Sequence, residues 1–174
     1  MTYNETRSRV TVERITLTSG RTFDDVLTSL YEGISRPDIA AAARAWLGAT
    51  SYEEFEKVIA EAAGPSGLMQ FLPLDQGAAL AKLPGVPPRR LERIIAGNPL
   101  TMARLTRHVP EAGSYAPVSI LVWEDGGAVH LAYDTMESSI APYGSEPAFA
   151  VARELDTEVL TLMRAAADPG SDSI

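Results

Sequence analysis

Among the side chains suited to proton transfer near neutral pH, the best placed is His130. The sequence contains two histidines, His130 and His108, and no cysteine. Histidine is the side chain whose ordinary pKa suits proton transfer near neutral pH. One hypothesis is therefore a cofactor-independent isomerase, cyclase or hydrolase with His130 as general acid–base and Asp134 and Tyr143 as its catalytic partners.

Other kinds of chemistry have little support in the sequence. The lack of cysteine excludes disulfides, thiolate nucleophiles, zinc–cysteine sites and iron–sulfur clusters. The two histidines are too far apart for a compact zinc motif, although one histidine would suffice for a haem. No Gly-x-Ser-x-Gly elbow, Walker motif or dinucleotide-binding motif occurs. We therefore expect neither a metal nor a cofactor.

A predicted β-hairpin positions His130. Two alternating segments, residues 116–124 and 128–136, flank Asp125-Gly126-Gly127, which is a strong hairpin signal. The alternation makes one face uniformly apolar, with Val118, Ile120, Val122, Val129, Leu131 and Tyr133. The opposite face carries Leu121, Trp123, His130 and Ala132. Because a face with Trp and Leu does not normally meet bulk water, we expect the inserted helices, a second subunit or a ligand to cover it.

This covered face leads to the main hypothesis, a small organic ligand in a largely apolar pocket between sheet and helices. The ligand-binding candidates are Met69, Phe71, Leu121, Trp123, Tyr133 and His108. His108 falls in the last turn of a predicted helix, where a cation also suits the helix dipole without any ligand. Two alternatives stay open: a buried His130 with a purely structural hydrogen bond, and an interaction protein whose Trp123 face is only a homodimer interface.

The remaining elements follow from periodicity and capping signals. Thr22, Ser51 and Asn98 are predicted helix N-caps, and Pro99 after Asn98 is typical of a first helical position. A final helix is expected from about Glu146, after a loop at 138–145. The expected strands and other helices cover residues 9–18, 22–34, 35–48, 51–63, 67–74 and 91–96, and a short helix is expected at 77–83.

Composition and charge narrow the class of protein. Hydrophobic residues make up 45% of 174 positions, which suits a single domain with its own core. The formal net charge of −8 argues against nucleic acid as a partner. The chain begins without a signal-peptide pattern and contains no membrane-spanning stretch, so we expect a soluble cytoplasmic protein that does not interact with membranes. The tail at 168–174 is predicted to be flexible.

One cluster of arginines is an exception to the net negative charge of the chain. It lies within twenty residues and consists of Arg89, Arg90, Arg93, Arg104 and Arg107. An ordinary solvated surface is the simplest interpretation. A small anionic ligand or an acidic partner surface is the alternative.

Several of these segments resemble the domain of unknown function 302 family. The resemblance rests on Gly97-Asn98-Pro99-Leu100, on Val109-Pro110-Glu111-Ala112-Gly113, and on residues 116–125. It implies a two-layer α+β sandwich of the TATA-binding-protein-like type, with a curved, mainly antiparallel sheet of about four to five strands packed against helices. It also implies a single domain, 1–174, with a family-like core at 10–34 and 67–166 and an inserted helical pair at 35–64. The resemblance also implies a homodimer. The family has no general activity that could be expected of this chain.

Overall fold

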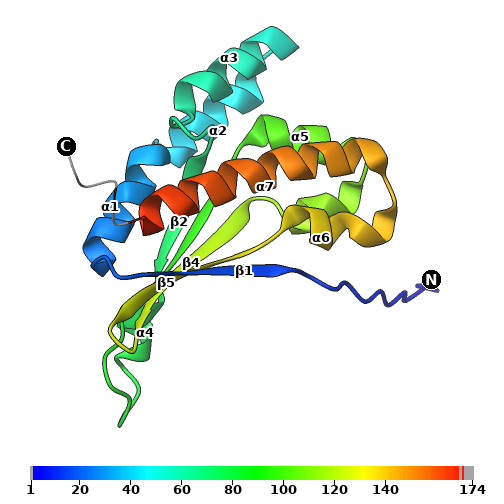
Figure 1. Ribbon diagram of the computed structural model, residues 1–174. Helices are drawn as coiled ribbons and strands as arrows, with labels where there is room; N and C mark the ends of the chain where they lie inside the picture. The colour runs from blue at the N-terminus through cyan, green and yellow to red at the C-terminus, as the bar shows by residue number, and fades with distance from the viewer. Residues whose placement is uncertain (1, 169, 171–174) are drawn as a thin grey trace.

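A five-stranded sheet forms the framework of the protein. The computed structural model describes residues 2–168 and 170. Within them the strands form one open antiparallel sheet in the order β1–β5–β4–β3–β2 (Figure 1). The bounds of the strands are β1 (Arg14–Ser19), β2 (Met69–Asp75), β3 (Leu91–Gly97), β4 (Val118–Asp125) and β5 (Ala128–Asp134).

Helices cover one face of this sheet, so the α+β sandwich expected from the sequence is confirmed. The longest helix, α7, crosses that face, and α1, α5 and α6 lie beside it (Figure 1). The helices are α1 (Phe23–Gly33), α2 (Ile39–Gly48), α3 (Tyr52–Ala62), α4 (Gln76–Leu80), α5 (Pro99–Thr106), α6 (Met136–Ile140) and α7 (Glu146–Ala167), with short 3₁₀ turns η1 (Pro110–Ser114) and η2 (Ala141–Tyr143). Within the described residues, no helix combines the length and apolar character needed to cross a membrane.

The predicted capping residues start the helices as expected. The side chains of Thr22, Ser51 and Asn98 accept hydrogen bonds from backbone N–H groups in the first turns of α1, α3 and α5. These N–H groups have no partner inside a helix, so each cap stabilises a helix start. These three capping residues therefore determine where α1, α3 and α5 begin.

The hairpin has the facing predicted from its alternation. Gly126 and Gly127 form the two-residue loop and both have positive φ, as a type I′ turn requires. Their conformation matches the twist of the flanking strands, so the register follows from the turn. All six residues of the predicted apolar face are buried against the helices: Val118, Ile120, Val122, Val129, Leu131 and Tyr133.

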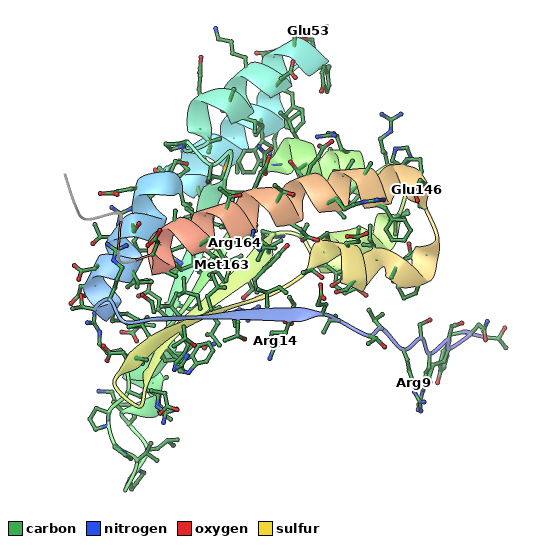
Figure 2. The ribbon with its side chains drawn as sticks, viewed as in Figure 1. Arg9, Arg14, Glu53, Glu146, Met163 and Arg164 are labelled. Carbon is green, nitrogen blue, oxygen red and sulfur yellow. The ribbon has the colours of Figure 1, made fainter. Side chains whose placement is uncertain are left out.

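The opposite face of the sheet, called the open face below, lies away from the layer formed by α1, α5, α6 and α7. Its cross-strand rows include Thr18–His130–Trp123–Leu91 and Thr16–Ala132–Leu121–Arg93. Figure 2 shows the labelled Arg14 on the side of β1 away from α7, and Met163 on the side of α7 that faces the sheet.

The expected cover from the helical pair α2 and α3 is wrong. Trp46 of α2 contacts Phe71 of β2, with ring centroids 6.3 Å apart, and α3 approaches α5. The pair therefore lies at the β2 edge and does not cover Trp123.

Three boundaries differ clearly from the sequence expectation. β1 begins at Arg14 and not at residue 9, because β5 ends at Asp134 and earlier residues have no partner strand in the described chain. α2 begins after Asp38, whose carboxylate caps it, and not at Ser35. The segment at 138–145, expected as a loop, contains most of α6 and all of η2. The predicted flexible tail lies mostly outside the described residues.

Candidate functional site

His130 lies half-buried on the open face, with few polar groups near its ring. Its ring stacks on Trp123, with centroids 5.0 Å apart and planes inclined by 26°. Its Nδ1 lies 3.0 Å from Oγ1 of Thr18 on the neighbouring strand. Both rings are half-buried. The contacts orient the imidazole, but a threonine hydroxyl offers it no ionised partner for proton transfer.

The other predicted catalytic residues lie elsewhere. Asp134 is four residues along β5 from His130, about 13 Å at about 3.3 Å per residue, and its two oxygens accept from Arg14 Nε and Nη2 at 2.6 and 2.8 Å. This charge-assisted pair holds the pKa of Asp134 below its ordinary value. Tyr143 lies in η2, where a hydrogen bond with Tyr115 raises its pKa. The structure does not bring His130, Asp134 and Tyr143 together.

The predicted ligand-binding residues also separate into different regions. Leu121 and Trp123 lie on the open face. Tyr133 lies on the helical side, where its hydroxyl donates to Asp156 at 2.6 Å. Met69 is buried at the start of β2, and Phe71 occupies a bulge two residues later. His108 is exposed beyond the end of α5. Of these predicted residues, Phe71 borders the cavity described next.

An apolar cavity lies between α2, α5 and the adjoining ends of β2, β3 and β4. Its volume is about 330 Å³, within the range of small-molecule sites. Trp46 and Phe71 form an aromatic wall. The other lining residues are Gly97, Asn98, Pro99, Thr101, Met102, Leu105, Gly113, Ala116, Pro117, Val118 and Leu155.

Asn98 fixes the wall that α5 contributes to this cavity. Its Oδ1 accepts from the backbone N–H groups of Leu100 and Thr101 at 2.8 and 3.4 Å. Its Nδ2 donates to the carbonyl of Gly67 at 2.9 Å. One amide side chain therefore ties the start of α5 to the turn before β2. Its hydrogen-bonding groups are largely used in this way, so they do not make the cavity polar.

Close backbone packing shapes the opposite wall. Gly97 ends β3 beside Pro117, and a Cβ at position 97 would lie 3.1 Å from the Cβ of Pro117. A larger residue would push these two segments apart. The glycine found in the Gly97-Asn98-Pro99 motif is thus explained by the approach of β3 to the segment that enters β4.

The chemistry of the lining favours binding over reaction. None of the described lining residues carries an ionisable side chain, and the polar ones are Asn98 and Thr101. The cavity therefore offers no general acid, base or charged nucleophile. In the described part of the chain, no three His, Asp or Glu side chains are grouped to hold a metal. The arrangement can select a ligand by shape and apolar contact.

Trp46, Met102 and Leu105 were not among the predicted site residues. Met102 and Leu105 stand at helical spacing, which is equally typical of a core, although Met102 is 38% exposed. For Trp46 the signal was weaker, a large aromatic residue in the alanine-rich segment Ile39-Ala40-Ala41-Ala42-Ala43 and beyond. No local pattern indicates that α2 and α5, some fifty residues apart, face one cavity.

The fold and the cavity define a class of protein, an open two-layer α+β sandwich with an apolar site at one edge of its sheet. Within that class, the chain belongs to the family described as domain of unknown function DUF302, whose model matches residues 47–166. The match begins inside α2, and the predicted division into core and inserted helical pair stays a prediction.

A solved structure supports the same fold. The crystal structure of an uncharacterized conserved DUF302 protein from Bacillus stearothermophilus aligns with a TM-score of 0.61 and 10% sequence identity. The alignment covers 88% of this chain and 97% of that chain. At this identity the likeness shows the fold alone. No curated protein matches the chain.

Proposed function

We propose that this protein binds a small, uncharged, largely apolar organic molecule in the cavity between Trp46, Phe71 and α5. The observation that carries the proposal is a cavity of about 330 Å³ whose described lining has aromatic and aliphatic walls and no ionisable group. Apolar surface removed from water contributes about 25 cal/mol per Å². A charged ligand would lose its hydration without a compensating partner, so the lining selects against it.

The two tryptophans of the chain allow this site to be observed directly. Trp46 lines the cavity, whereas Trp123 lies on the open face. In a Trp123→Phe protein, all tryptophan emission comes from Trp46. Bromocyclohexane is an uncharged probe whose bromine quenches tryptophan fluorescence only at contact distance. We expect saturable quenching in Trp123→Phe and no saturable quenching in Trp46→Phe.

Thermal unfolding gives a second measurement. A ligand at about ten times its Kd stabilises the folded state by about 1.4 kcal/mol, which raises the Tm of a chain of this size by about 3–5 °C. Bromocyclohexane should therefore raise Tm in the unmodified protein, and the concentration dependence should give the same Kd as the quenching.

A matched pair of variants tests the location of the site. Ala116→Phe places a ring in the cavity, whereas Ala103→Phe makes the same change on an exposed position of α5 outside it. Ala116→Phe should abolish quenching and the Tm shift, and Ala103→Phe should retain both. Thr101→Phe fills the cavity from α5 and serves if Ala116→Phe does not fold. Quenching that persists in both filled variants, or no saturable quenching of Trp46, would contradict the proposal.

A further inference from the structure

The five arginines that lie close together in the sequence do not form one surface. Arg93 differs from three of them in its partner. Arg89 pairs with Asp125, Arg90 with Asp24, and Arg104 with Glu154. These pairs account for three of the five arginines as surface ion pairs. Arg93 instead extends from β3 over the open face, where it has a different partner.

Arg93 is held by a neutral group and keeps most of its hydrogen-bonding capacity. Its Nε donates to Oγ of Ser119 on β4 at 2.6 Å. Within the described residues, no carboxylate forms an ion pair with it. Both terminal nitrogens of the guanidinium therefore remain available as donors, in the planar geometry that matches the two oxygens of a carboxylate.

The surroundings of Arg93 form a second cavity, distinct from the apolar one. Its volume is about 550 Å³, and it lies on the open face between β1 and β3. The charged residues of its described lining are Arg93, Arg14 and Asp134. Arg14 neutralises Asp134 with two hydrogen bonds. Arg93 therefore gives this cavity a positive charge, although the formal net charge of the whole chain is −8.

The apolar residues of this cavity limit what the anion can be. Leu121 lies directly opposite Arg93 in the sheet register, and Ala132 lies opposite Leu121. Both side chains line the cavity. A hydrocarbon chain attached to an anionic group can contact them while the anion meets Arg93. An inorganic anion can meet Arg93 but makes no apolar contact with Leu121 and Ala132.

We propose that this cavity binds a small monocarboxylate with a short hydrocarbon chain. Arg93 binds the carboxylate, Ser119 positions the guanidinium, and Leu121 and Ala132 contact the hydrocarbon. The site is independent of the apolar cavity of the proposed function, although Pro117 and Val118 border both.

Hexanoate is the probe for the test, with acetate, hexanol and inorganic phosphate as comparisons, by isothermal titration calorimetry. Hexanoate should bind more tightly than acetate or phosphate, and added NaCl should weaken it. Arg93→Gln should raise the Kd by about ten-fold or more, because a charge-assisted pair of hydrogen bonds is lost. Hexanol should not compete with hexanoate for this site.

Arg107→Gln is the matched control. It removes the same charge from the exposed end of α5, outside this cavity, and should leave the Kd within about two-fold. Equal weakening in both arginine variants would overturn the proposal, as would equal affinity for phosphate and hexanoate.

The apolar cavity is tested in the same experiment. Hexanoate binding should survive in Ala116→Phe, and its loss there would show that the probe enters the apolar cavity instead. Bromocyclohexane quenching of Trp46 should be unchanged by Arg93→Gln, so failure of one proposal is distinguishable from failure of the other.

Discussion

At the scale of single residues, the carboxylate of Asp156 joins three elements of the core. It lies on α7 and is 7% exposed. Its Oδ1 accepts from the Tyr133 hydroxyl at 2.6 Å and from the N–H of Met136 at 2.7 Å, and its Oδ2 accepts from the N–H of Glu137 at 3.0 Å. One side chain therefore caps α6 and ties β5 to α7. Burial, with the neighbouring Asp156 charge, raises the pKa of Tyr133.

We expect Asp156→Ala to lower the free energy of unfolding by about 3 kcal/mol. The change leaves buried donors without an acceptor, and each such group costs about 1–3 kcal/mol, although the costs do not add fully. Urea unfolding followed by circular dichroism measures the loss. Thr157→Ala, at the exposed neighbouring position, should change stability by about 0.5 kcal/mol or less. Similar losses in the two variants would show that the Asp156 contacts contribute little.

The position of Tyr133 was predictable from the sequence, but the role of its hydroxyl was not. Alternation in the hairpin places Tyr133 on the apolar face, and that face is buried. A buried hydroxyl needs a hydrogen-bond partner, yet Asp156 is 23 residues away in the sequence. Nothing in the local pattern distinguishes an aspartate that caps another helix from one exposed on the surface of its own.

At the scale of elements, the start of α5 determines the shape of the apolar cavity. Asn98→Ala removes the cap of α5 and the tie to Gly67 together. We expect a loss of about 2 kcal/mol in unfolding free energy, because a lost cap alone costs about 1 kcal/mol. The bromocyclohexane-induced Tm shift should fall as well, since α5 loses its fixed position.

Ser51→Ala is the control for this change. Ser51 caps α3 through the N–H of Glu54 at 3.1 Å and is not among the residues that line the cavity. Its loss should cost about 1 kcal/mol and leave the Tm shift intact. If Asn98→Ala costs no more than Ser51→Ala, the hydrogen bond to Gly67 does not contribute to stability.

Elements with local signals were predicted well, and those that depend on distant partners were not. The Asp125-Gly126-Gly127 turn and the alternation on either side determine the hairpin without help from the rest of the chain. The start of β1 at Arg14 depends on where β5 stops, which residues 9–13 do not reveal. The cavity depends on how α2 meets α5, so the weak local signal of Trp46 did not place it in a site.

At the scale of the whole molecule, the open face carries an apolar patch. Leu91, Trp123 and His130 lie in one cross-strand row, and Leu121 lies in the next. Such a patch is typical of a surface that another molecule covers. The helical pair of this chain does not cover it, which leaves a second subunit or a ligand among the covers expected from the sequence. The homodimer implied by the family resemblance, like the cytoplasmic location, stays a prediction.

We expect the row Leu91–Trp123–His130, beside the Arg93 cavity, to form the centre of a homodimer interface. A stable interface buries at least about 1,000 Å² in total, and a carboxylate at its centre would be desolvated without a partner. Sedimentation equilibrium should therefore give twice the chain mass of 18.7 kDa for the unmodified protein and 18.7 kDa for Trp123→Glu. Leu47→Glu, at a position that is 80% exposed on α2, should stay dimeric. A monomeric unmodified protein at all concentrations, or a dimer that survives Trp123→Glu, would rule out this interface.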